Sequence, residues 1–230
     1  MKTINDFEYR KHGNIVLHQY KTIYFFIPKV ACSSLKIVCS DLLGIAPPNP
    51  AMPHRGAHIR DYPFVKREEI PSRYNDYFKF CFVRNPWDRL VSCYHNKISK
   101  DKDLNDRWFE KGVERFFLRY GDAFRGGMSF TKFVEEICRI PDSIANDHFR
   151  SQYTFITDPD GDLLVDFIGR FEKLGEDFDY ICQRLGLRDV ELPHILKSQH
   201  DDYRIYYDDV SICRVRERYA GDIELLGYEF

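Results

Sequence analysis

Apolar residues occur along the chain in two alternating patterns, short continuous runs and longer segments with helical spacing. Residues 22–28 and 78–83 are short runs of aromatic and β-branched side chains, and they predict buried strands. After each run the apolar positions take up the spacing of an amphipathic helix, over residues 33–43 and 87–98. The sequence therefore predicts two units made of a strand, a tight turn and a helix.

The carboxyl-terminal half continues this alternation. A helix is predicted from Ser129, a favourable N-cap, to residue 139, and a strand is predicted over residues 165–169. Two further helices are predicted over residues 176–185 and 210–226. Strands that alternate with helices favour a mainly parallel central sheet with helices on both faces. We therefore expect an α/β protein.

The expected fold is a single domain over residues 1–230, built in three layers, with one interruption. Residues 99–127 are charged and have glycines near their end, which predicts an insertion or a lid. Arginines and aromatic residues within it suit a surface that stacks on sugars and pairs with acidic groups. The same pattern is typical of an amphipathic helix with a solvated cationic side, so both interpretations stay open.

Composition limits the classes of function that fit this chain. Its 230 residues are 43% hydrophobic, enough for a sizeable core, and the formal net charge is −2. A protein without excess positive charge is a poor candidate for nucleic-acid binding, and any anion site has to be built locally. No run approaches the ~18 apolar residues of a membrane span, and the amino terminus lacks the apolar core of a signal peptide. We expect a cytoplasmic protein without a membrane span.

The seven cysteines are scattered along the chain, and no two of them form a C-x-x-C pair. This pattern disfavours a structural metal site and a disulfide framework, and it favours reduced thiols. We therefore expect no metal and no disulfide.

The first predicted turn, residues 28–36, connects a buried strand to the amino terminus of a helix. The unpaired amides and positive dipole at such a terminus bind phosphate or sulfate. Lys29 adds a positive charge, and Ser33 and Ser34 add hydroxyl donors. The G-x-x-x-x-G-K-[ST] pattern of a Walker A loop is absent. A simpler interpretation is that Ser33 caps the helix and Lys29 is a solvated strand end.

The second predicted turn follows the strand at residues 78–83. Arg84 leaves the end of this strand, where ligands of open α/β sheets usually bind, and Ser92 lies about two helical turns further on. An arginine and a serine together make a suitable clamp for a phosphate monoester. The alternative is an ion pair between Arg84 and Asp88 that only caps the helix.

Together, the two turns carry a resemblance. Pro-Lys-x-x-x-Ser-Ser-x-Lys from Pro28, followed by Val-Arg-Asn-Pro-x-x-Arg-x-x-Ser-x-Tyr from Val83, resembles the sulfotransferases that use 3'-phosphoadenosine 5'-phosphosulfate (PAPS). The likeness is greatest to the carbohydrate branch, which includes chondroitin 4-O- and HNK-1 sulfotransferases, and to its soluble bacterial relatives. Residues 146–152, 165–177 and 219–228 resemble later elements of the same branch. Eukaryotic members carry a membrane anchor, for which this chain shows no candidate segment.

The resemblance implies a P-loop-like fold, and it implies how the donor is held. The first motif would bind the 5'-phosphosulfate, with Lys29 near the bridging oxygen, and the second motif would bind the 3'-phosphate. Lys36 either contacts the donor or is exposed on its helix. The residues that would bind PAPS, or its product 3'-phosphoadenosine 5'-phosphate (PAP), are Lys29, Ala31, Cys32, Ser33, Ser34, Lys36, Arg84 and Ser92.

A histidine suits the role of general base, because its pKa of about 6.5 allows proton abstraction near neutral pH. His58 lies between the two motifs, where related sulfotransferases place their catalytic histidine. His148, within the element at residues 146–152, is the second candidate. Together with Lys29, these two histidines are the candidate catalytic residues.

The sequence therefore predicts an enzyme that transfers a sulfuryl group from PAPS to a hydroxyl group of a carbohydrate. A P-loop-like kinase or nucleotide hydrolase using ATP and Mg²⁺ is the first alternative, and the missing Walker A glycines oppose it. A non-catalytic protein on the same fold that binds a glycan or a partner is the second. The identity of the acceptor and the oligomeric state stay undetermined.

Overall fold

The computed structural model describes residues 13–46, 62–98, 109–110, 113–193 and 201–230. The chain divides into two compact units. Met1–Val83 with Thr154–Lys197 form the first, which we call the sheet unit, and Arg84–Tyr153 with Ser198–Phe230 form the second, the helical unit. The single domain expected from the sequence stays a prediction.

The described part of the sheet unit contains one five-stranded sheet with the order β3-β1-β2-β4-β7. β2 pairs in parallel with β4, and β4 pairs in parallel with β7. β1 pairs antiparallel with both β2 and β3, so the sheet has a parallel core and an antiparallel edge that the sequence analysis did not predict. The strands are β1 Asn14–Leu17, β2 Thr22–Phe25, β3 Phe64–Val65, β4 Phe78–Val83 and β7 Phe167–Arg170.

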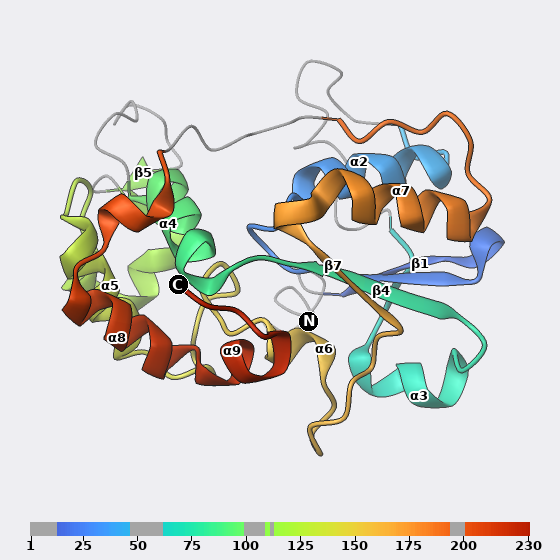
Figure 1. Ribbon diagram of the computed structural model, residues 1–230. Helices are drawn as coiled ribbons and strands as arrows, with labels where there is room; N and C mark the ends of the chain where they lie inside the picture. The colour runs from blue at the N-terminus through green and yellow to red at the C-terminus, as the bar shows by residue number, and fades with distance from the viewer. Residues whose placement is uncertain (1–12, 47–61, 99–108, 111–112, 194–200) are drawn as a thin grey trace, which may run out of the picture. The chain divides into compact units, whose positions relative to one another are not determined.

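Helices flank this sheet. Figure 1 shows α2 and α7 together on one face and α3 on the opposite side. The predicted α/β class, with parallel core strands and flanking helices, is confirmed. The helices of the sheet unit are α2 Cys32–Leu42, α3 Ile70–Arg73 and α7 Leu174–Leu185, with the short 3-10 helices η1 His18–Tyr20, η3 Arg67–Glu69 and η5 Phe171–Lys173. The chain passes from the helical unit to the sheet unit within α6 Tyr153–Ile156.

Two neighbouring strands approach closely where β7 carries a glycine. A Cβ atom added to Gly169 would lie 2.6 Å from Cε1 of Phe82, a ring that is fully buried in β4. Because the ring has no room to move, we expect Gly169→Ala to lower the free energy of unfolding by about 1–3 kcal/mol. Urea unfolding of the two proteins measures the difference.

A second glycine supplies the control for this substitution. A Cβ atom added to Gly175, near the start of α7, would meet nothing within 4 Å. Since alanine is the better helix former, Gly175→Ala is expected to be neutral or to stabilise the protein by up to ~1 kcal/mol. Equal urea midpoints for Gly169→Ala and the unsubstituted protein would show that β4 and β7 are not packed this closely.

The helical unit begins directly after β4. Asn85 caps α4, its side chain accepting a hydrogen bond from the Trp87 amide, and Ser129 caps α5 as predicted. The helix predicted over residues 210–226 is corrected to two helices, because the backbone leaves helical geometry at Tyr219 (φ −111°, ψ 28°). The elements are α4 Pro86–Lys97, α5 Phe130–Cys138, α8 Asp209–Arg218 and α9 Ala220–Leu226, with β5 Phe109–Glu110, β6 Val113–Glu114, η4 Arg115–Ala123 and η6 Tyr203–Tyr206.

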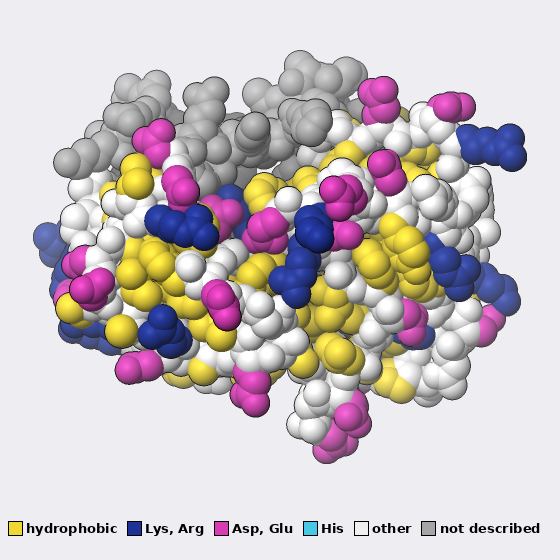
Figure 2. Space-filling view, viewed as in Figure 1, with side chains coloured by type: hydrophobic (Ala, Val, Ile, Leu, Met, Phe, Trp, Pro, Cys, Tyr) yellow, Lys and Arg dark blue, Asp and Glu magenta, His cyan; other side chains and the backbone are white. Residues whose placement is uncertain are grey.

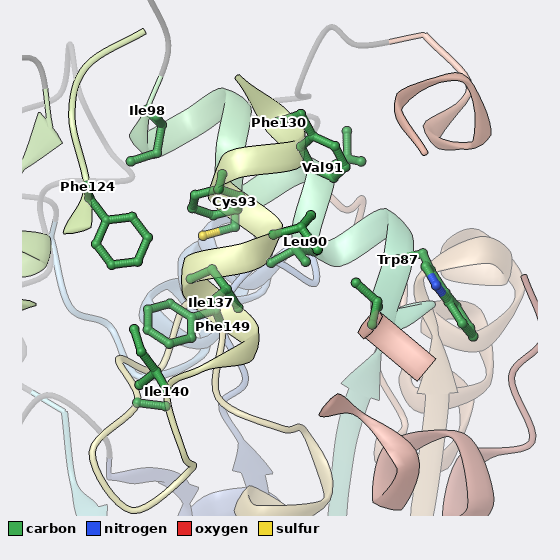
Figure 3. Close-up of a cluster of buried hydrophobic side chains, with 14 of the residues drawn as sticks. Trp87, Leu90, Val91, Cys93, Ile98, Phe124, Phe130, Ile137, Ile140 and Phe149 are labelled. Carbon is green, nitrogen blue, oxygen red and sulfur yellow. The ribbon is translucent and has the colours of Figure 1, made fainter. Parts of the chain in front are cut away.

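The core of the helical unit is a cluster of apolar side chains, many of them aromatic, between α4, α5 and the segments that follow them (Figure 3). Phe117 and Phe124 belong to this cluster and are at most 2% exposed. The end of the predicted insertion at residues 99–127 therefore packs into the core of this unit. Residues 99–108 and 111–112 lie outside the described part of the chain, and a lid role for the segment stays a prediction.

The surface carries charges of both signs. Figure 2 shows Lys and Arg side chains interspersed with Asp and Glu side chains on the visible face. All seven cysteines are free thiols. In the part of the chain that the structure describes, no helix is long and apolar enough to cross a bilayer. No cluster of three or more His, Cys, Asp or Glu side chains suited to a metal ion occurs among the same residues.

Candidate functional site

The turn between β2 and α2 has an unusual backbone. Lys29 and Ala31 both have positive φ angles, 74° and 60°. The left-handed conformation costs a non-glycine residue roughly 1–2 kcal/mol, and residues held in it cluster at ligand clamps and active sites. Alternating left- and right-handed residues turn successive amide groups toward one concave surface that binds anions. The conformation of this turn therefore favours an anion.

The helix that follows the turn begins without a side-chain cap. Its N-cap is Ala31, which has no side-chain hydrogen bond, and its first turn contains no acidic residue. The interpretation that Ser33 caps α2 is therefore wrong. Within the described residues, the hydroxyls of Ser33 and Ser34 form no hydrogen bond. The first amides of a helix have no partner inside it, so Cys32 and the two serines present a set of donors to an anion.

Two lysines accompany this turn, with different surroundings. Lys29 lies within the turn and is half-buried. Lys36 lies on α2, about one turn after the helix begins at Cys32. Its Nζ atom is 3.6 Å from the centroid of the Phe26 ring, a cation–π contact. Burial lowers the pKa of the Lys36 ammonium group. Lys36 is therefore not the exposed side chain that the sequence analysis considered, and its contact with the donor stays a prediction.

Arg84 is the first residue of the helical unit and is 4% exposed. Its Nε atom lies 2.7 Å from Oδ2 of Asp88, and its Nη2 atom lies 2.9 Å from Oδ1. The ion pair that we weighed as an alternative to phosphate binding is thus present. A two-point pair fixes the plane of the guanidinium group, and a phosphate that binds Arg84 has to compete with Asp88 or share the group with it.

The rest of the second motif lies on α4. Arg89 donates hydrogen bonds to the carbonyl oxygens of Arg150 (2.7 Å) and Asp147 (2.8 Å), and burial lowers its pKa. Arg89 therefore joins α4 to the segment that carries His148, a structural role. Ser92 is buried on α4, one turn beyond Arg89.

The environment of His148 is defined by Asn146. Oδ1 of Asn146 accepts a hydrogen bond from the backbone amide of His148 and lies 2.6 Å from its Nδ1 atom. The bond from the backbone amide identifies this atom of Asn146 as the oxygen, which can only accept. Nδ1 therefore has to donate, and the neutral ring carries its proton there. Nε2 then bears the lone pair that a general base needs. His58, the other candidate base, lies outside the described residues.

Each unit thus gathers one set of predicted site residues. Two further residues were missed by sequence reasoning, Gln152 and Asp222, which are fully buried and belong to the hydrogen-bond network around Arg84. They lie in two segments whose resemblance to family elements was noted, and that was the only signal available. The sheet unit holds Lys29, Ala31, Cys32, Ser33, Ser34 and Lys36, and the helical unit holds Arg84, Ser92 and His148.

The sequence of the chain is similar to those of several known proteins. The chain is 31% identical to carbohydrate sulfotransferase 14 of Danio rerio over 93% of its own length and 61% of that protein. It is 29% identical to carbohydrate sulfotransferase 11 of Mus musculus over 80% of its length and 56% of that protein. It is 27% identical to carbohydrate sulfotransferase 9 of Homo sapiens, over 93% of its length and 52% of that protein.

The chain spans between 45% and 61% of the length of the curated relatives most similar to it. No solved structure gave a significant match. A profile of the sulfotransferase family matches residues 12–229, nearly the whole sequence. The chain therefore belongs to the sulfotransferase family of enzymes.

Proposed function

We propose that the protein transfers a sulfuryl group from PAPS to a hydroxyl group of a carbohydrate. The observation that carries this proposal is the left-handed, uncapped turn at the start of α2, which offers donors to an anion and has Lys29 within it. Membership of the sulfotransferase family supports PAPS as the donor. The names of the relatives, all carbohydrate sulfotransferases, support a sugar as the acceptor.

The residues of the first turn suit the 5' end of the donor. Bound PAPS supplies the sulfuryl group, and charge develops on the phosphate oxygen that it leaves. The amides at the start of α2 and the hydroxyls of Ser33 and Ser34 would hold the phosphosulfate. Lys29 would neutralise the developing charge, which fixed donors stabilise more in the transition state than in the ground state.

The residues of the second turn suit the 3'-phosphate. Arg84 is held in one orientation by its two-point pair with Asp88, and an oriented guanidinium loses little freedom when it binds a phosphate. Ser92 adds a hydroxyl on the same helix as Asp88. A second anion site, separate in sequence from the first, is what a nucleotide with phosphates at both its 3' and 5' positions requires.

A histidine would remove the proton of the acceptor hydroxyl. Two residues fit this role, His58 by its position between the motifs and His148 by the tautomer that Asn146 imposes. A base within hydrogen-bond reach of the acceptor contributes roughly 10²–10⁴-fold to the rate.

Calorimetric titration with PAP and with ATP–Mg²⁺ tests the donor assignment. We expect PAP to bind and ATP–Mg²⁺ to bind much more weakly, because only PAP places a phosphate on Arg84. An assay with sulfur-labelled PAPS and a panel of glycans then tests the acceptor. No heat with PAP at millimolar concentration, or tighter binding of ATP–Mg²⁺, would contradict the proposal.

A further inference from the structure

The backbone of Arg84 is held by a side chain that lies far away in the sequence. The Arg84 amide donates to Oε1 of Gln152 at 2.9 Å, and Nε2 of Gln152 donates to the Arg84 carbonyl at 2.8 Å. One side-chain amide therefore satisfies both main-chain groups of Arg84, as a neighbouring strand would do. Gln152 is fully buried, so water does not compete for these bonds.

Gln152 is itself held by a buried carboxylate. Oδ2 of Asp222 accepts hydrogen bonds from the backbone N–H of Gln152 at 2.9 Å and from the side-chain Nε2 of Gln152 at 3.4 Å. Oδ1 of Asp222 accepts from the amide of Tyr153 at 2.8 Å. Burial raises the pKa of the Asp222 carboxyl, and the two backbone donors oppose that shift. Only a carboxylate offers acceptors on both oxygens, which explains this residue type at a fully buried position.

Close packing brings Asp222 to this position. The residue before it, Gly221, faces the ring of Tyr153, and a Cβ atom there would lie 2.8 Å from the ring. A larger residue at Gly221 would push the start of α9 away from the segment that contains Gln152. The absence of a side chain at Gly221 therefore allows Asp222 to accept its hydrogen bonds from Gln152 and Tyr153.

We propose that Gln152 and Asp222 are positioning residues for Arg84, which set the place from which its guanidinium group meets the 3'-phosphate of the donor. Asp222 fixes Gln152, and Gln152 fixes the main chain of Arg84 at the point where β4 has ended. The pair with Asp88 then fixes the direction of the side chain. This inference rests on the proposed function, because it assigns Arg84 to the 3'-phosphate.

The physical reason lies in the two buried groups that Gln152 satisfies. Without its amide, the N–H and C=O groups of Arg84 lose their buried partner and the main chain moves to find another. Loss of a charge-assisted hydrogen bond between Arg84 and the phosphate weakens binding by roughly 10- to 100-fold. The substitution should lower only the affinity that the 3'-phosphate contributes. The affinity contributed by the rest of the nucleotide should stay unchanged.

The test compares two nucleotides that differ only in the 3'-phosphate, PAP and adenosine 5'-monophosphate. For the unsubstituted protein, calorimetry gives the dissociation constant of adenosine 5'-monophosphate divided by that of PAP. This ratio measures what the 3'-phosphate contributes to binding. We expect Gln152→Ala to lower this ratio by about 10- to 100-fold, through weaker PAP binding alone. Asp222→Asn should lower it in the same direction by a smaller factor, and it serves as the second variant if Gln152→Ala does not fold.

A matched control separates positioning from general destabilisation. Tyr219→Phe removes a buried hydrogen bond, from the Tyr219 hydroxyl to the Phe149 carbonyl at 2.6 Å, in the same unit. It should lower stability and leave the ratio unchanged. If the unsubstituted protein binds PAP and both Gln152→Ala and Asp222→Asn keep its ratio, the positioning role is overturned. If the unsubstituted protein does not bind PAP, the proposed function fails first, a result that is distinguishable from the other.

Discussion

Replacing Lys29 by alanine is expected to lower kcat for sulfuryl transfer by about 10²–10³-fold. Affinity for PAP should fall by a much smaller factor, because in the proposed function the amides and serine hydroxyls at the start of α2 would still hold the 5' end. The measurement is steady-state turnover with labelled PAPS, together with calorimetry of PAP binding. A large effect on kcat with a small effect on binding is the signature of a group that acts mainly in the transition state.

The expected size follows from where the charge appears. When the sulfuryl group leaves, negative charge grows on the phosphate oxygen, and a cation fixed in place stabilises it without reorganisation. In the proposed function Lys29 supplies this cation, from a half-buried turn in which its backbone has a positive φ angle. A lysine on a freely moving loop would lose more entropy on reaching the same position.

A second lysine provides a strict control. Lys21 also has a positive φ angle, 44°, and lies at the other end of β2 in an exposed ion pair with Asp76. Exposed pairs contribute about 0–1 kcal/mol to stability, so Lys21→Ala should leave kcat within about 2-fold. A Lys29→Ala protein that turns over as fast as Lys21→Ala would remove Lys29 from the catalytic residues.

The sequence predicted the elements whose signal is local. The strand at residues 78–83 has the same bounds in the structure, and the cap at Ser129 and the end of the helix predicted over residues 176–185, which Gly186 terminates, were both correct. Each of these features depends on a few neighbouring residues, such as an apolar run, a hydroxyl that caps a helix, or a glycine that ends one. β3 was missed because two residues, Phe64–Val65, are too few to show a period.

The features that define the site are less visible in the sequence. Left-handed residues are expected at glycine or asparagine, and a lysine and an alanine at positions 29 and 31 give no such signal. The bonds between Gln152 and Asp222 join residues that are 70 positions apart, a pairing that no local pattern encodes. Sequence patterns thus located the two turns that we propose as anion sites, while positive φ angles and long-range hydrogen bonds determine how those turns are held.

Replacing the histidine that we propose as the general base by alanine is expected to lower kcat/KM by about 10²–10⁴-fold. We expect this loss for His58→Ala, because His58 lies between the two anion-binding motifs, and a much smaller loss for His148→Ala. The opposite result would assign the base to His148, whose Nε2 lone pair suits proton abstraction equally well. His18, which is exposed and pairs through Nδ1 with the Tyr77 hydroxyl, is the control, and His18→Ala should not change the rate.

The pH profile shows whether the lost group is a base or only a contact. A histidine base is active when neutral, so log kcat/KM should rise with pH up to the pKa of the histidine, near about 6.5, and then level off. In the variant that lacks the base this rise disappears, and the remaining rate depends on pH only through other groups. A variant that is slow but keeps the rise has lost a positioning contact instead. The base is therefore the histidine whose replacement both lowers kcat/KM by the larger factor and removes the rise with pH.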